Sequence, residues 1–126
     1  MHDVMPFTAV IGAQALAASA DEVRARIAWN ETLCTSGGLM HGGVLMSLAD
    51  SVGAWCAFFN LPPNSTTTTI ESKTNFLRAV RKGHVEAIAR PLHKGRTIIV
   101  IDTEVRDDDG KLVARVSQTQ AVLPRT

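Results

Sequence analysis

Residues 41–59 read HGGVLMSLADSVGAWCAFF, and this stretch decides the fold. Large apolar side chains recur along it at spacings of three and four residues, which is the pattern of one buried helix face. These side chains are Leu45, Leu48, Val52, Trp55 and Phe59. Pro62 and Pro63 follow, and proline cannot continue a helix. The sequence therefore predicts one long helix that begins near His41, ends near Phe59 and packs its apolar stripe against a core.

A second face of the predicted helix carries small side chains, one methionine and the only charge of the stretch. Its members are Gly43, Met46, Asp50, Gly53 and Ala57. At about 100° per residue, Asp50 lies roughly 200° from Leu48 around the helix axis and so points away from the apolar stripe. Two interpretations stay open: Asp50 is a solvated charge on a polar strip, or it is a functional carboxylate on a face that a second backbone approaches closely.

The start of the helix adds a second functional signal. Gly42 and Gly43 leave the first amide N–H groups open, and these groups have no partner within the helix. The helix dipole adds partial positive charge, so such amides can hold a substrate carbonyl or an oxyanion, although a flexible helix start would use the same glycines. With His41 nine residues before Asp50, we expect the carboxylate and the amide end of its own helix to converge on one reactive carbon, in a cavity completed by a second copy.

Strand patterns surround the helix in the sequence. Residues 23–29 alternate apolar with charged or small side chains, which predicts a half-buried strand, whereas residues 10–19 fit either helix or strand. Cys34–Gly38 is a loop by composition. After the helix, β-branched and apolar runs predict strands over residues 66–70, 75–80, 84–92, 97–106 and 112–123.

The connections between these later strands are too short for crossover helices, so the sheet is expected to be mostly antiparallel. Pro91 is expected at a bulge or an edge because it cannot donate to a strand ladder. Asp107–Gly110 predicts a hairpin turn. The predicted fold class is therefore α+β, with a long central helix wrapped by a mostly antiparallel, curved sheet of five or six strands.

The length of 126 residues predicts a single domain, over residues 1–126. The chain is 45% apolar and 20% charged with a formal net charge of +1, which gives no electrostatic case for a nucleic-acid or membrane partner. Asp50 in mid-helix argues against a membrane span, and the N-terminus lacks a secretory signal pattern. Cys34 and Cys56 form neither a disulfide framework nor a zinc pattern, so we expect a cytoplasmic protein without a bound metal.

Residues 41–50, HGGVLMSLAD, resemble the signature of hotdog-fold acyl-CoA thioesterases of the phenylacetic-acid-degradation (PaaI-like) type, in which HGG precedes an Asp or Glu. The resemblance continues through residues 75–80 (NFLRAV), 91–96 (PLHKGR) and 109–114 (DGKLVA), and it covers roughly residues 25–123. It implies the hotdog fold, a homodimer paired through the sheets, and a homotetramer built as a dimer of dimers.

The resemblance also implies a role for each residue of the motif. Asp50 takes the place of the catalytic carboxylate, Gly42 that of the N–H group that polarises the thioester carbonyl, and His41 stands beside the thioester. Relatives often carry Asn or Gln where this chain has Thr35, which leaves the orientation of His41 and of the attacking water open. The implied reaction hydrolyses an aryl- or medium-chain acyl-CoA to free acid and CoA, with Asp50 as nucleophile or general base and no cofactor beyond the CoA of the substrate.

Coenzyme A needs a place for its phosphates, and six basic residues fall within 19 positions of the chain. They are Arg78, Arg81, Lys82, Arg90, Lys94 and Arg96. Taken with the resemblance, the predicted contacts of the acyl-CoA are Gly43, Ser51, Ala54, Thr69, Phe76, Leu77, Arg78, Ala79, His93, Lys94, Gly95, Arg96 and Thr97. Ser47 is also expected at the acyl pocket, together with residues of a partner subunit. Trp55 is a further candidate, but its place in the apolar stripe favours the core.

Two other functions stay open on the sequence alone. One is a hotdog dehydratase or hydratase that acts on acyl thioesters, which needs a histidine and a carboxylate facing each other across an interface. The other is a hotdog domain that binds acyl-CoA without catalysis.

Overall fold

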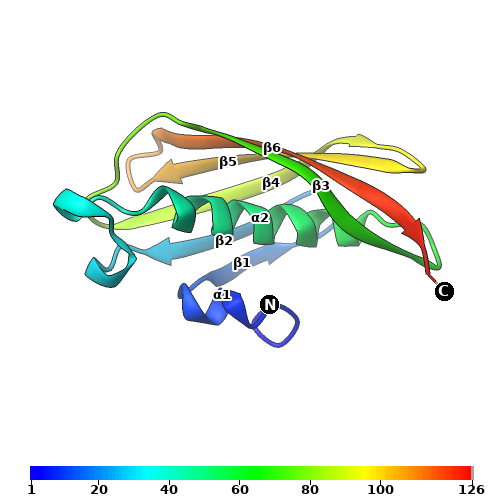
Figure 1. Cartoon of the computed structure of the whole chain (residues 1–126), viewed down its shortest axis with the longest axis horizontal. Helices are drawn as coiled ribbons and strands as arrows, with labels where there is room; N and C mark the ends of the chain where they lie inside the picture. Colours follow the sequence, from blue (N-terminus) through cyan, green and yellow to red (C-terminus); the bar gives the residue numbers. More distant parts are fainter. Residues whose placement is uncertain (126) are drawn as a thin grey trace.

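Helix α2 (Gly42–Phe59) lies across one face of a six-stranded sheet that curves around it in the computed structural model, which describes residues 1–125 (Figure 1). Neighbouring strands are antiparallel, in the order β1-β2-β4-β5-β6-β3. The strands are β1 (Gln14–Ala18), β2 (Val23–Ala28), β3 (Ser65–Phe76), β4 (His84–Lys94), β5 (Ile98–Asp107) and β6 (Leu112–Pro124). A short helix α1 (Phe7–Val10) precedes β1, and two 3-10 turns, η1 (Glu31–Leu33) and η2 (Ser36–Gly38), lead into α2. The predicted α+β architecture is confirmed.

The buried side of α2 differs from the predicted stripe at its C-terminal end. Leu45, Leu48 and Val52 are buried as predicted, but Trp55 is half-buried and Phe59 is 37% exposed. Cys56 is fully buried instead, because the core line follows the four-residue step from Leu48 through Val52. By length and composition α2 could cross a membrane, yet it contacts β2 through β6, as a core helix does.

The predicted small face of α2 divides between core and surface. Gly53 and Ala57 are buried, which the sequence did not predict, whereas Met46 and Asp50 are exposed. The curved sheet reaches around this flank of the helix, and the backbone of Gly53 lies directly against the side chain of Gln118 on β6. A close approach of a second backbone to these small residues was expected, but at Gly53 the neighbour is a side chain, that of Gln118 on β6 of the same chain.

β3 is longer than either of the two strands predicted there. It pairs with β6 along its length, from Ser65 opposite Pro124 to Phe76 opposite Ala114. Residues 77–80 were predicted as strand but lie outside the sheet, because the ladder with β6 ends at Phe76. Within the described chain β3 is an edge strand, with β6 as its one neighbour.

Other predicted local features are confirmed. The β4 ladder shifts register between Pro91 and His93, which is the bulge expected at the proline. At the β5–β6 turn, the Asp107 side chain accepts hydrogen bonds from the amides of Asp109 and Lys111, and Gly110 has a φ of +78°. The ambiguous residues 10–19 end α1 and then form β1.

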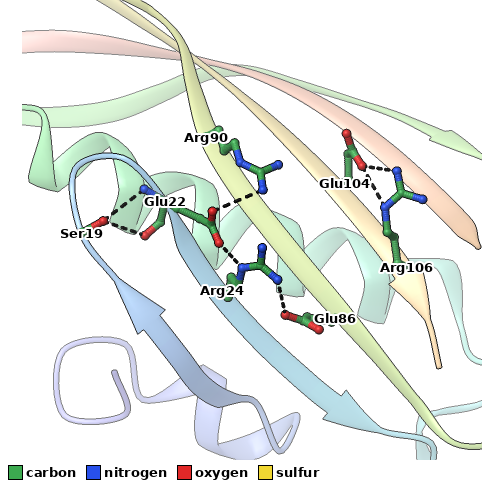
Figure 2. A network of polar contacts seen from close by, with 7 residues as sticks. All are labelled: Ser19, Glu22, Arg24, Glu86, Arg90, Glu104 and Arg106. Carbon is green, nitrogen blue, oxygen red and sulfur yellow. Dashed lines mark hydrogen bonds and ion pairs between the residues drawn. The ribbon is translucent and has the colours of Figure 1, made fainter. Parts of the chain in front are cut away.

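The face of the sheet opposite α2 carries partly exposed ion pairs (Figure 2). The pairs drawn are Glu22–Arg24, Glu22–Arg90, Arg24–Glu86 and Glu104–Arg106. The hydrogen bond from Arg24 holds the pKa of the Glu22 carboxyl below its usual range. Ion pairs that water can reach contribute little to stability, because water and salt screen them.

Candidate active site

The start of α2 presents one free amide and one capped amide. The His41 Nδ1 atom accepts a hydrogen bond from the Gly43 N–H group at 2.8 Å, so neutral His41 carries its proton on Nε2. The Gly42 N–H group makes no hydrogen bond within residues 1–125. Of the two amides expected to be open, Gly42 therefore remains as the donor that a ligand can use.

A cavity of about 350 Å³ opens beside Gly42. It brings together predicted site residues that are distant in sequence, and its walls are Thr35, Leu39, Met40, Gly42, Leu45, Phe76, Leu77, Arg78 and Ala79. The Phe76 ring packs so closely on Gly42 that a Cβ atom there would lie 3.1 Å from Phe76 Cε1. The short loop before α2 and the segment after β3 thus form one hollow at the start of the helix.

Asp50 lies two turns further along α2, and its carboxylate meets a buried amide. The Gln118 Nε2 group donates a hydrogen bond to Asp50 Oδ1 at 2.9 Å, and Gln118 is fully buried on β6. The outer atoms of Asp50 reach solvent in a single chain, while desolvation of the carboxyl group by the surrounding protein raises its pKa. No ion pair involves Asp50 in the part of the chain that the structure describes.

Asp50 and Gly42 of one chain do not converge on a single point. Eight residues at a rise of 1.5 Å separate them by about 12 Å along the helix axis, whereas two groups that act on one carbonyl must each lie within about 3 Å of it. The expectation that the carboxylate and the amide end of its own helix meet at one carbon is therefore wrong for a single chain.

The predicted acyl-pocket residues divide into two groups. The Ser51 hydroxyl donates to the Ser47 carbonyl oxygen at 2.8 Å, and the Ser47 hydroxyl donates to Gly43 in the same way, so both hydroxyls are engaged in the helix. Ala54 and Trp55 line a second cavity of about 200 Å³. Sequence reasoning missed its other walls, which are Val4, Met5 and Phe58.

Two buried glutamines also escaped the sequence analysis. Thr69, a predicted contact, accepts a hydrogen bond from Gln120 Nε2 at 2.8 Å and lies 3.4 Å from Gln118 Nε2. The available signal was the alternation of β6, which places Val116, Gln118 and Gln120 on the same inward face. Two glutamines among inward positions of a strand are unusual enough to mark a polar network.

The predicted CoA contacts fall at opposite ends of the sheet (Figure 1). Phe76 pairs with Ala114 of β6, whereas Ile98, next to Thr97, pairs with Ala121. Seven residues at about 3.4 Å each place these levels roughly 24 Å apart along β6. His93, Lys94, Gly95, Arg96 and Thr97 at the β4–β5 turn are therefore distant from Leu77, Arg78 and Ala79 in one chain.

The six basic residues consequently do not form one patch within a chain. Arg90 is paired with Glu22 on the outer face, at 3.2 Å (Figure 2). Arg81 and Lys82 line a cavity of about 530 Å³ whose other walls include Asp107, Asp108 and Asp109, and these carboxylates oppose a phosphate. Arg78, Lys94 and Arg96 remain as candidate phosphate ligands, at the two ends.

The family model of the thioesterase superfamily matches residues 37–114 of this chain. The chain belongs to the thioesterase superfamily. A solved thioesterase of Haemophilus influenzae is 28% identical, with a TM-score of 0.88 over 94% of this chain and 82% of that one. A solved variant of a thioesterase of Pseudomonas aeruginosa is 30% identical, with a TM-score of 0.88 over 94% of this chain and 86% of that one. These structures share the hotdog fold, which confirms the predicted architecture for this thioesterase-superfamily chain.

A curated relative of this chain is the 1,4-dihydroxy-2-naphthoyl-CoA hydrolase of Escherichia coli. It is 31% identical over 86 residues, which are 68% of this chain and 63% of that protein. Curated relatives from P. aeruginosa, Saccharolobus solfataricus and H. influenzae match over 61%, 63% and 62% of their own lengths. The chain thus matches about three fifths of the length of these relatives.

Proposed function

We propose that this protein is an acyl-CoA thioesterase that hydrolyses an aryl- or medium-chain acyl-CoA to the free acid and CoA. The observation that carries the proposal is the pair of groups on α2: an unbonded Gly42 amide beside a cavity, and an Asp50 carboxylate held by an uncharged buried amide. Membership of the thioesterase superfamily supports the reaction class. The name of the E. coli relative, a hydrolase of an aromatic acyl-CoA, supports an aryl substrate.

The two groups divide the chemistry between them. The Gly42 N–H group donates to the thioester carbonyl oxygen and stabilises the negative charge that grows there. Asp50 either attacks the carbonyl carbon directly or removes a proton from a water that attacks it. If water attacks, the carbon–sulfur bond breaks to give the free acid, and the proton taken from water passes to the leaving CoA sulfur. If Asp50 attacks, the broken carbon–sulfur bond leaves a mixed anhydride on Asp50, the CoA sulfur takes a proton from solvent, and water then hydrolyses the anhydride to the free acid and restores the carboxylate. The His41 Nε2–H group is available as a donor beside the thioester.

The active site is proposed to lie between two copies of the chain, because Gly42 and Asp50 of one chain are about 12 Å apart. β3 supplies the dimer contact: it is a 12-residue edge strand rich in β-branched side chains, and its Ile70 is 60% exposed. Two-fold pairing of β3 with its copy brings Gly42 of one subunit toward Asp50 of the other. Such dimers are proposed to pair again into a homotetramer.

The same two-fold pairing resolves the separation of the predicted CoA contacts. It places opposite ends of two sheets next to each other, so Lys94 and Arg96 of one copy approach Arg78 of the other. These three side chains are proposed to hold the CoA phosphates. Thr35 takes the place that a longer amide often holds in PaaI-like thioesterases, the type to which we assign this chain.

The protein is proposed to act in the cytoplasm, without nucleic acid or membrane as a partner. No group of three or more His, Cys, Asp or Glu side chains in residues 1–125 is arranged to hold a metal ion. Hydrolysis by Asp50 and the Gly42 amide needs no cofactor beyond the CoA of the substrate.

A thiol-release assay across aromatic and aliphatic acyl-CoAs tests this proposal. We expect turnover with the wild type and a loss of about 10²- to 10⁴-fold in kcat with Asp50→Asn. Asp109→Asn, at the exposed β5–β6 turn, is the matched control and should keep wild-type rates. Hydration of an enoyl-CoA without thiol release would identify a hydratase instead, and tight acyl-CoA binding without either reaction would identify a binding domain.

A further inference from the structure

The carboxylate of Asp50 accepts a hydrogen bond from a buried side chain, Gln118, whose own oxygen has no partner in the described chain. Gln118 is fully buried, and its Nε2 group donates to Asp50 Oδ1 at 2.9 Å. Its Oε1 atom is also buried but has no hydrogen-bond partner in the described chain. A buried oxygen without a partner lowers stability. An apolar residue, like Val116 two positions earlier on the same face, would avoid that cost, so stability alone does not account for Gln118.

Gln120 provides an internal comparison, because it is the next inward-facing residue of β6. It is also buried, at 1% exposure, but both ends of its amide are satisfied. Its Nε2 donates to the Thr69 hydroxyl at 2.8 Å, and its Oε1 accepts from the Thr67 hydroxyl at 3.0 Å. Gln120 therefore links β6 to β3 through two short hydrogen bonds, whereas Gln118 directs its one short hydrogen bond to Asp50 Oδ1 and lies further from the Asp50 carbonyl oxygen, at 3.5 Å, and from the Thr69 hydroxyl, at 3.4 Å.

The space for the Gln118 amide is created by a glycine on the helix. A Cβ atom at Gly53 would lie 1.9 Å from Gln118 Oε1 and 3.0 Å from Gln118 Cδ. Any other residue at position 53 must therefore displace the amide. Gly53 is three residues after Asp50 on α2, so the carboxylate and the gap that admits its partner are adjacent on one helix flank.

We propose that Gln118 is a positioning residue for Asp50: its N–H group fixes Oδ1 and so aims Oδ2 at the substrate carbonyl, while Gly53 supplies the gap through which the amide reaches the carboxylate. Oδ2 makes no hydrogen bond within the described residues, so it is the oxygen left for chemistry. This inference rests on the proposed function of Asp50. Fixing one oxygen limits the side chain to one direction of attack, which is the geometric requirement for a fast reaction.

The first test compares two matched substitutions, Gln118→Met and Gln120→Met, which keep side-chain volume and remove the amide. Gln118→Met should lower kcat by about 10- to 100-fold, while KM changes by less than about twofold. The reason is that the Asp50 carboxylate loses its fixed orientation, whereas the groups that bind the substrate are unchanged. Gln120→Met should change kcat by less than about threefold, whatever its effect on the unfolding midpoint. Equal kcat for Gln118→Met and the wild type would overturn the proposal.

The second test uses the gap and does not depend on Gln118→Met folding well. Gly53→Ala should lower kcat by about as much as Gln118→Met and should also lower the unfolding midpoint, because the methyl group displaces the amide. In a Gln118→Ala background the amide is gone, so adding Gly53→Ala should change neither kcat nor the midpoint further. If Gly53→Ala lowers kcat or the midpoint as much in the Gln118→Ala background as in the wild type, the proposed role of the Gly53 gap is contradicted.

The Asp50→Asn variant distinguishes a failure of the proposed thioesterase function from a failure of the positioning role of Gln118. If it retains turnover, the proposed function of Asp50 fails, and the positioning role fails with it. If it is inactive while Gln118→Met and Gly53→Ala both keep wild-type kcat, the thioesterase proposal stands and only the positioning role is overturned.

Discussion

Polar side chains have opposite environments on the two faces of the sheet. On the outer face, charged side chains pair with one another in contact with water, as Glu22 does with Arg24 and Arg90. On the face that carries α2, Gln118 is uncharged and buried, and the single carboxylate of Asp50 rests on it. Solvated pairs are easily replaced, whereas a buried polar group destabilises the fold unless it has a partner. The few polar groups in an apolar setting therefore indicate the chemistry better than the many charges outside.

Apart from Asp50→Asn, the largest effect is expected on the helix-bearing side, at Gly42. Gly42→Pro removes the N–H group but suits the first position of a helix, and His41 already has the extended backbone (φ −62°, ψ 134°) that a following proline requires. We expect kcat to fall by about 10²- to 10³-fold in the thiol-release assay, as for loss of one oxyanion donor.

Gly42→Ala is the matched control for this substitution. It makes the same Cβ contact with the Phe76 ring at 3.1 Å but keeps the N–H group, so its kcat should fall by less than about tenfold. Equal losses for the alanine and proline variants would mean that crowding of Phe76, and not the missing donor, explains the effect.

The next effect is the pH dependence of kcat/KM, which depends on Asp50 on the helix-bearing side. Desolvation raises the pKa of Asp50, and the carboxylate is the proposed active form, so kcat/KM should fall about tenfold per pH unit as the pH drops below that raised pKa. A pH–rate profile without an acid limb above about pH 4, the ordinary value for Asp, would contradict this environment.

The same pKa shift should make the free energy of unfolding increase as the pH falls, whereas kcat/KM decreases. The folded chain holds a proton on Asp50 more readily than the unfolded chain, so stability rises as the pH falls through the raised pKa. At neutral pH, Asp50→Asn should therefore keep or raise the thermal unfolding midpoint while activity is lost. A clear fall of the midpoint would mean that the carboxylate stabilises the fold.

The smallest effect is expected on the outer face. Glu22→Gln removes the charge that pairs with Arg24 and Arg90, both of which are at the surface. Urea unfolding should show a change within about 1 kcal/mol that shrinks with salt, and thiol release should stay within about twofold of wild type. A tenfold loss of activity would show that the outer face takes part in function and would break the comparison between the faces.

The fold could be predicted because its signals are local. The apolar spacing from Leu45 to Val52, the turn at Asp107 and the proline at position 91 each act over a few residues, and each is confirmed. The C-terminal end of the buried stripe could not be predicted, because it depends on whether the curved sheet covers the side chain of Trp55 or that of Cys56.

The site could be predicted only where residues adjacent in sequence share an element. His41 and Gly42 are neighbours at one helix start, and the resemblance included both. Gln118 lies 68 residues from Asp50, and contact between them depends on the register of β6 against α2. The prediction that the basic residues lie together in one chain was wrong for the opposite reason. They are close in sequence, but Lys94 and Arg96 are at the β4–β5 turn, at the far end of the sheet from Arg78.

The most direct test of the shared active site is subunit complementation. If the proposed dimer forms, Asp50→Asn and Gly42→Pro should each be nearly inactive as homodimers. A mixed dimer should have one site with an intact Gly42 from one copy and an intact Asp50 from the other. After the two variants are unfolded together and refolded in equal amounts, we expect about a quarter of wild-type thiol release, since half of the dimers are mixed and each has one good site of two. A mixture no more active than its parents would contradict an active site shared between two copies.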